Sequence, residues 1–241
     1  EMRGIMQSVL TILISPPPGP PDLKPGPLVE YRGKGCVRDL GIKTPDGDLA
    51  TSVEDALAVA DRIGYPVVLK AQAAQLMHKS DVGGVAVNVR DADALRDAWS
   101  RMQDSIAAKC PGMVLDGILV EAMSRPGLEM VIGGRRDANW GVVMLVGLGG
   151  IWIEALHDVK LLPPDLTVPQ IVSAMHTLKG AKLLSGLRGK GPVDLQAVAE
   201  AVSRLAALML ANPEITEIDV NPLIALPEGE GVIALDALFV M

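Results

Sequence analysis

Three consecutive apolar segments with glycines at their ends limit what the middle of this chain can fold into. They are GILVEAM (117–123), LEMVIGG (128–134) and GVVMLVGLGGIWIE (141–154). Short apolar runs separated by glycine turns are typical of successive antiparallel strands. We therefore expect an antiparallel meander here, beginning the second of two lobes.

Helical periodicity is found on both sides of this meander. In the segment 51–64, Ser52 and Asp55 form a capping box, apolar residues recur on one face, and Gly64 follows the last turn. Further helices are expected after Asp91, after Thr167 and from Asp194 to Leu210. Residues 28–40 are only weakly helical, because Gly33 and Gly35 interrupt them.

The remaining apolar runs predict two strand pairs. YPVVLK (65–70) and GVAVNV (84–89) form one expected antiparallel pair, and ITEIDVNPLIAL (215–226) with GVIALDALFV (231–240) form the closing pair. Mixed helices and antiparallel strands in two lobes make an α+β fold.

A proline-rich segment sets the expected domain limits. Residues 16–27 hold seven of the eighteen prolines, which favours extended linker geometry. We expect 1–27 to be a linker or the end of a preceding module, 28–117 the first lobe and 118–241 the second.

Composition excludes several classes of function. A net charge of −7 argues against a nucleic-acid surface, and no apolar run is long enough to span a bilayer. Cys36 and Cys110 make neither a metal motif nor a disulfide framework, and the N-terminal apolar patch has no signal-peptide cleavage site. The expected location is the cytoplasm.

Lys70 and the loop that follows it are the first candidates for chemistry. Lys70 ends a buried strand, where it is either a solvated tip or a contact for an anion such as phosphate. In the stretch LMHKSDVGGVAV (76–87), Gly83 and Gly84 either form an ordinary hairpin turn or offer backbone N–H groups to phosphate. His78 in the same loop is either solvated or a nucleophile or base.

Carboxylates near the lobe junction and the C-terminus are the second set. Glu121 follows a buried strand, so it is either a half-exposed strand carboxylate or a ligand contact. Glu217, Asp219 and Asn221 share one strand face, and Asp236 in the next strand needs a partner if it is buried. Oxygen ligands without Cys or His suit Mg²⁺, although a structural polar network would use the same residues.

Taken in order, these motifs resemble a known family. The set YPVVLK, HKSDVGGV, ILVEAM, GLGGIWIE and EIDVNPL…ALDAL is similar to the ATP-grasp domain of NDP-forming acyl-CoA synthetases. These are ADP-forming acetate–CoA ligases and relatives, distant kin of the succinyl-CoA synthetase β subunit. The resemblance covers residues 28–241 and implies the ATP-grasp fold, in which two lobes clamp a nucleotide.

The resemblance also implies roles for particular residues. Lys70 would contact the phosphates of ATP or ADP, Mg²⁺ would be held by Asn221 and Asp236, and the adenosine end would meet the backbone at Val120 and the side chain of Glu121. The loop over the phosphates would contain His78, Lys79, Ser80, Gly83 and Gly84, and the glycine turn with its following acid would be Gly149, Gly150 and Glu154.

The family's reaction is acyl-CoA + ADP + phosphate ⇌ acid + CoA + ATP, with phosphate carried on a histidine of a separate CoA-binding module. The resemblance thus implies that this module is a partner, fused or separate, and that it would bring the acid or acyl-CoA. It also implies an oligomeric enzyme. His78 would carry the phosphate briefly. Two alternatives stay open: a non-catalytic, ligand-sensing domain of a regulator such as a protein acetyltransferase, and a carboxylate–amine ligase. An arginine expected after the glycine turn is missing, and Lys160 is the available substitute.

Overall fold

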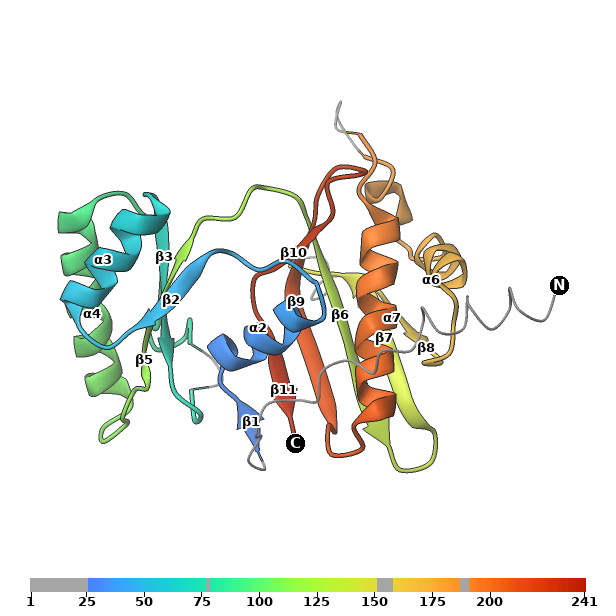
Figure 1. Ribbon diagram of the computed structural model, residues 1–241, viewed down its shortest axis with the longest axis horizontal. Helices are drawn as coiled ribbons and strands as arrows, with labels where there is room; N and C mark the ends of the chain where they lie inside the picture. Colours follow the sequence, from blue (N-terminus) through green and yellow to red (C-terminus); the bar gives the residue numbers. More distant parts are fainter. Residues whose placement is uncertain (1–25, 77–78, 151–157, 187–190) are drawn as a thin grey trace, which may run out of the picture.

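The computed structural model describes residues 26–76, 79–150, 158–186 and 191–241, and these form two sheets with helices packed on them (Figure 1). The smaller sheet has four strands and the larger has seven. Helices and antiparallel strands are mixed in each lobe, as the α+β prediction requires.

The first lobe is the four-stranded sheet with two helices packed on it. Its strand order is β2 (Gly47–Ala50), β5 (Gly117–Ala122), β3 (Val67–Gln72), β4 (Val85–Val89), and all neighbours are antiparallel. Helices α3 (Val53–Ile63) and α4 (Ala92–Lys109) lie on one face (Figure 1). They enclose an aliphatic core with one buried tryptophan, Trp99.

The second lobe is built on the seven-stranded sheet. Its strands run in the order β1 (Pro27–Leu28), β11 (Leu238–Val240), β9 (Glu217–Ala225), β6 (Leu128–Asp137), β7 (Gly141–Leu148), β8 (Val159–Leu162), and β10 (Val232–Ala234) also pairs with β9. Helix α7 (Leu195–Ala211) covers one face, α6 (Val168–Met175) packs on α7 and β8, and the short 3₁₀ helix η1 (Ala181–Leu183) follows α6.

Local signals in the sequence predicted most of these elements correctly. The Ser52 side chain accepts a hydrogen bond from Asp55 N at 3.1 Å, and Asp91 and Asp194 cap α4 and α7 in the same way. The two strand pairs and the β6–β7 hairpin are antiparallel as expected. Each of these features depends on residues only a few positions apart.

The boundary expected between the two lobes, at 117/118, does not coincide with the division of the chain between the two sheets. Strand β5 lies inside the four-stranded sheet, between β2 and β3, so it belongs to the first lobe. Conversely, Pro27 and Leu28 pair with β11, and Val37 and Ile42 lie in the core of the second lobe. The chain therefore enters the second lobe first, crosses to the first lobe for 47–122, and returns.

Helix α2 (Glu30–Asp39) continues through both glycines that were expected to interrupt it. A Cβ at Gly33 would overlap the carbonyl oxygen of Ala237, whereas a Cβ at Gly35 would meet nothing within 4 Å. Gly33 therefore allows α2 to lie directly against the connection between β10 and β11. Packing outweighs the low helix propensity of glycine at this position.

Two further expectations concern the chain as a whole. Within the described ranges, no helix is both long enough and apolar enough to cross a membrane. Cys36 and Cys110 are both free thiols, the first buried and the second partly exposed.

The two glycines of α2 give a matched test of this packing. Gly33→Ala is expected to destabilise the protein by about 1–3 kcal/mol through overpacking, although alanine is the better helix former. Gly35→Ala is expected to stabilise it by about 0.5–1 kcal/mol. Urea unfolding followed by circular dichroism measures both, and equal effects of the two changes would contradict the close approach of α2 to Ala237.

Candidate functional site

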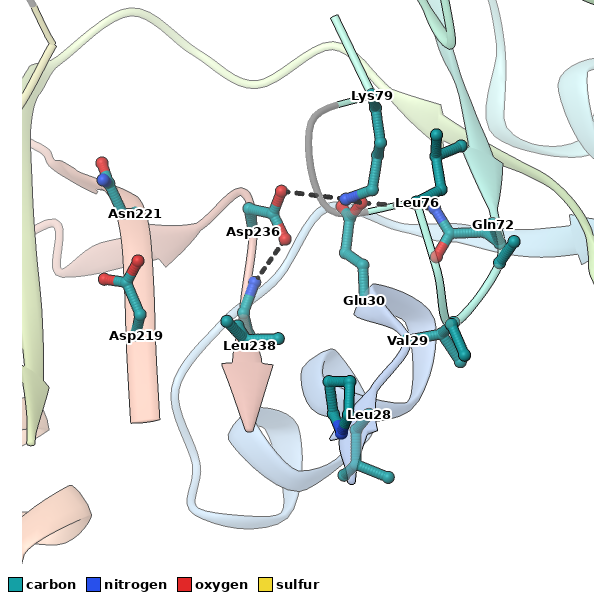
Figure 2. A pocket seen from close by; sticks show the side chains of 14 residues that line it. Leu28, Val29, Glu30, Gln72, Leu76, Lys79, Asp219, Asn221, Asp236 and Leu238 are labelled. Carbon is teal, nitrogen blue, oxygen red and sulfur yellow. Dashed lines mark hydrogen bonds and ion pairs between the residues drawn. The ribbon is translucent and has the colours of Figure 1, made fainter. Parts of the chain in front are cut away.

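A cavity of about 450 Å³ lies where α2, the end of β3 and the strands β9 and β11 meet. Figure 2 shows the side chains that line it. From one side it receives Glu30, Gln72 and Lys79, and from the other Asp219, Asn221 and Asp236. Residues from both sheets therefore face a single space.

Glu30, in the first turn of α2, is the centre of the polar network beside this cavity. Its side chain is 1% exposed, and its carboxylate meets three ammonium groups: Lys34 Nζ at 2.9 Å, Lys70 Nζ at 2.7 Å and Lys79 Nζ at 2.6 Å. Gln72 Nε2 adds a hydrogen bond to Glu30 Oε2 at 3.2 Å. A buried carboxylate requires such compensation, because an unpaired charge in this environment is very costly.

Lys34 and Glu121 form the innermost ion pair of the network. Lys34 Nζ lies 2.6 Å and 2.7 Å from the two oxygens of Glu121, and both side chains are buried. Glu121 was expected to contact the adenosine end of a nucleotide. In this structure both of its oxygens are already engaged by lysines, so that contact requires at least one ion pair to rearrange.

Lys70 joins the two lobes. It extends from β3 of the first lobe to Glu30 of the second, and its Nζ also donates to the backbone oxygen of Leu235 at 2.6 Å. Glu121 Oε2 is 3.2 Å from the same nitrogen. The sequence left Lys70 either at the solvated tip of a strand or in a cleft; its side chain is only 14% exposed, and it is not among the residues that line the cavity.

The close charges shift the ionisation of these groups. Burial is the largest single influence on Glu30 and would raise its pKa, but Lys70, Lys34 and Lys79 together hold that pKa well below its usual range. Burial would likewise lower the pKa of Lys70, and the surrounding carboxylates raise it instead. Lys34 is different, because burial and the neighbouring Lys70 charge lower its pKa. Glu30 and Lys70 are thus held firmly in their charged forms.

The opposite wall of the cavity carries the residues expected to supply oxygen ligands. In the pairing of β9 with β10, Leu223 lies opposite Ala234, and in its pairing with β11, Asp219 lies opposite Leu238. This register sets Asn221 opposite position 236. Asp236 was expected inside a buried strand. It lies instead in the break between β10 and β11, with its side chain 37% exposed, and it accepts hydrogen bonds from Lys79 Nζ at 3.1 Å and Ala237 N at 2.8 Å.

Asp219 adds a second carboxylate to this wall. Burial, followed by the neighbouring charges of Asp236 and Glu217, raises the pKa of Asp219 to about 6. Among the described residues, no three His, Cys, Asp or Glu side chains come together as a metal site of their own. Mg²⁺, however, is usually bound by one or two carboxylates together with substrate phosphates and water. Asp236, Asn221 and Asp219 fit that mode of binding.

The predicted phosphate loop forms a tight turn in this structure. Gly83 N donates to Ser80 O at 3.2 Å, and Gly84 N donates to Lys79 O at 2.7 Å. The sequence left open whether these N–H groups belong to an ordinary hairpin turn or are offered to phosphate, and in this structure both are used within the turn. Gly84 is needed there, because a Cβ at that position would be 2.9 Å from Lys79 O.

The remaining predicted residues fall into three groups. Gly149 and Gly150 end β7 beside Glu129: Gly149 N donates to Glu129 O at 2.8 Å, and a Cβ on Gly150 would overlap the Glu129 carboxylate. Val120 is buried inside the four-stranded sheet, opposite Leu69 and Asp48. His78 and Glu154 lie outside the described residues.

Sequence reasoning gave no role to Glu30, Lys34 and Gln72. The signals were present: Glu30 and Lys34 are four residues apart and so share a helix face, and Gln72 follows Lys70 by two residues and so shares a strand face. What the sequence could not supply was the contact between α2 and β3.

A second cavity, of about 480 Å³, lies on the face of the seven-stranded sheet that carries Asp219 and Asn221. Its other walls are largely apolar and include Trp140 and Leu161, which are 82% and 70% exposed. Asp219 and Asn221 line both cavities, so the two spaces meet at the oxygen ligands.

Comparisons with known proteins agree with this geometry. A family model described as an ATP-grasp domain matches residues 24–241. A trans-feruloyl-CoA synthase from an unknown prokaryotic organism is 44% identical over 220 residues, which are 91% of this chain and 31% of that protein. The β subunit of ADP-forming acetate–CoA ligase I from Pyrococcus furiosus is 34% identical over 215 residues, which are 89% of this chain and 92% of that subunit.

A solved structure gives the same result in three dimensions. The acetyl-coenzyme A synthetase 1 of Ca. Korarchaeum cryptofilum, described as dinucleotide-forming and in complex with coenzyme A, Ca-AMPCP and HgCl⁺, superposes with a TM-score of 0.86 at 36% identity. The match covers 90% of this chain and 93% of that one. The chain therefore belongs to the ATP-grasp family, in the group that includes the β subunits of ADP-forming acetate–CoA ligases.

Proposed function

We propose that this chain is the nucleotide-binding component of an ADP-forming acyl-CoA synthetase. In the reaction acyl-CoA + ADP + phosphate ⇌ acid + CoA + ATP, it would bind ADP or ATP with Mg²⁺ and exchange a phosphoryl group with a phosphohistidine. The observation that carries the proposal is the cavity between the lobes, where ammonium groups face carboxylate and amide oxygens.

That arrangement suits the phosphates of a nucleotide. Lysine ammonium groups bind phosphate oxygens as point charges, and stabilising transferred charge is the main task of a phosphoryl-transfer site. Lys79 lines the cavity and Lys70 lies just behind it. A related structure from Ca. Korarchaeum cryptofilum, 35% identical with a TM-score of 0.76, contains Mg-AMPPCP, with a phosphohistidine segment pointing towards the nucleotide binding site.

Asn221 and Asp236 would hold Mg²⁺, with Asp219 close enough to assist. When bound, the ion neutralises charge on the phosphates during transfer. The protein's part is to present oxygen atoms from two facing segments. When no ion is bound, the Lys79 ammonium group offsets the negative charge of Asp236.

A partner must bring the phosphohistidine and the CoA chemistry. This chain spans 31% of the length of the trans-feruloyl-CoA synthase, and it matches a whole β subunit in the Pyrococcus furiosus enzyme. The CoA-binding module, fused or separate, would thus lie outside residues 1–241. The apolar groove beside Trp140 meets the nucleotide cavity at Asp219, which makes it a suitable approach for the partner's histidine segment. An oligomeric enzyme in the cytoplasm stays part of the proposal.

Some assigned roles rest on the resemblance alone. His78 as a transient phosphate carrier, Glu154 as an acid near the glycine turn, and Val120 as an adenine contact are proposals of this kind. The roles proposed for Ser80, Gly83 and Gly84 require their turn to open, because two of its N–H groups are engaged internally.

A second candidate is a non-catalytic, ligand-sensing domain. The observation in its favour is that Glu30 and Glu121 already neutralise the lysines, as a purely structural network would. Phosphoryl transfer separates the two functions. The donor is the ³²P-phosphorylated CoA-binding module of the related enzyme. We expect its labelled phosphoryl group to be transferred to ADP, and this transfer to be lost in the His78→Ala variant. Absence of label on both ADP and His78 would favour the regulator.

Binding of Mg-ADP tests the nucleotide site itself. Lys70→Met is expected to weaken binding at least about 100-fold, because it removes a buried charge-assisted contact. Asp236→Asn should weaken Mg-ADP binding about tenfold and leave binding of metal-free ADP unchanged or stronger. Isothermal titration calorimetry measures both, with the exposed Lys182→Ala as the matched control. Equal affinities in all four proteins would refute the site.

Asp219 gives a pH-dependent prediction for the metal-free protein. Its pKa is raised to about 6 in the folded state, so the folded state favours the protonated form. The stability this provides is fully present below about pH 4, the unfolded pKa, and is lost as the pH rises through about 6. Asp219→Asn should therefore gain about 2 kcal/mol relative to wild type between pH 4 and pH 7. Urea unfolding across this range checks the prediction, and a pH-independent difference would contradict it.

A further inference from the structure

The ammonium group of Lys70 is closely surrounded by oxygens in this structure. Its Nζ, which carries three N–H bonds, donates to Glu30 Oε1 at 2.7 Å and to Leu235 O at 2.6 Å, and Glu121 Oε2 lies 3.2 Å away as an ion-pair contact. A phosphate oxygen that binds Lys70 must therefore compete with these three oxygens.

Lys79 is engaged in a similar way. It lines the cavity, yet its Nζ lies 2.6 Å from Glu30 Oε2 and 3.1 Å from Asp236 Oδ2. Figure 2 shows the Glu30 carboxylate pointing from α2 towards Lys79, beside the space that the phosphates would enter. Within the described ranges, Glu30 is the one carboxylate that contacts both Lys70 and Lys79 through its two oxygens.

Glu30 has a second set of partners, Lys34 and Gln72, of which Gln72 also lines the cavity. Lys34, one helical turn further along α2, lies 2.9 Å from Glu30 Oε1, and Gln72 Nε2 lies 3.2 Å from Oε2. Lys34 and Gln72 are both buried, and Lys34 does not line the cavity. Glu30 can thus release Lys70 and Lys79 and still keep a counter-charge and a hydrogen bond.

We propose that Glu30 is a positioning residue that holds Lys70 and Lys79 in place of the nucleotide phosphates, and that the phosphates displace it when a nucleotide binds. Lys34 and Gln72 then retain the released carboxylate. The proposal rests on the proposed nucleotide function and adds to it an internal anion that competes for the same two lysines.

The charge balance of the network favours displacement of Glu30 by the phosphates over binding of the phosphates beside an unmoved Glu30. Three buried or largely buried lysines face two buried carboxylates, Glu30 and Glu121, and Asp236 completes neutrality. Phosphates placed beside an unmoved Glu30 would meet its negative charge at close range, and like charges in a site of low dielectric repel strongly. If Glu30 gives up Lys70 and Lys79 and keeps its contact with Lys34, it moves away from the phosphates and that repulsion is reduced.

Glu30→Gln tests the proposal through a change in selectivity. The variant removes the competing charge, so ADP should bind about tenfold more tightly than to wild type, whereas adenosine, which lacks phosphates, should bind equally to both. Calorimetry with ADP and adenosine gives the two affinities. The matched control is Glu200→Gln, an exposed glutamate on α7 paired with Arg204, which should change neither. If Glu30 had only a structural role, Glu30→Gln would not change the affinity for ADP differently from the affinity for adenosine.

Three results would count against the proposal. Weaker or unchanged ADP binding in a folded Glu30→Gln variant would overturn it while wild-type binding upheld the nucleotide site. A parallel change in ADP and adenosine affinity would show a general effect on the fold and would also overturn it. Failure of wild type to bind ADP at all would refute the proposed function along with it.

A structure of the wild-type chain with Mg-ADP decides the matter even if Glu30→Gln does not fold. We expect Lys70 or Lys79 Nζ within hydrogen-bond distance of a phosphate oxygen, and Glu30 held by Lys34 and Gln72. If both lysines still contact Glu30 while the phosphates lie elsewhere in the cavity, the proposal is wrong.

Discussion

The arrangement of the two lobes depends on the ion network around one buried carboxylate, Glu30. Its charge is stable in the interior only because Lys34, Lys70 and Lys79 surround it. Glu30 belongs to a helix of the larger lobe, whereas Lys70 belongs to the sheet of the smaller one. Satisfying this charge therefore requires α2 to lie against β3, and that contact forms one wall of the cavity.

The same requirement gives the cavity its polarity. Gly33 lets α2 approach the break between β10 and β11, where Lys70 binds Leu235 O and where Asp236 leaves the strand. Ammonium groups thus come from the side of β3, and carboxylate and amide oxygens from β9 and the β10–β11 break. A nucleotide with its metal ion needs both kinds of group close together, and the lysine that lines the cavity comes from one lobe whereas the carboxylates that line it come from the other.

What the sequence could predict follows from how far apart the interacting residues are. Caps such as Ser52 and Asp91, and the hairpins, depend on neighbours, and their predictions are confirmed. Which sheet β5 and Pro27–Leu28 join depends on pairing between distant segments. The limits expected for the first lobe, 28 and 117, were drawn from the order of the segments, and neither coincides with the sheets. The candidate site shows the same limit: Lys70 and Asp236 stood out by residue type, but the Glu30 contacts span 40 and 49 positions and have no local signature.

The physical chemistry of buried ion pairs explains why such a network would be kept. Apolar residues at positions 30, 34 and 121 would join α2 to β3 at least as firmly, since burying a set of ions gains little stability over well-packed hydrophobic side chains. They would, however, leave Lys70 without a carboxylate contact and Lys79 with Asp236 alone whenever the site holds no anion, which would push Lys70 towards its neutral form or out into solvent. A carboxylate that has a second set of partners avoids both outcomes. It keeps the lysines charged and in place before phosphate arrives, and it can withdraw onto Lys34 when phosphate does.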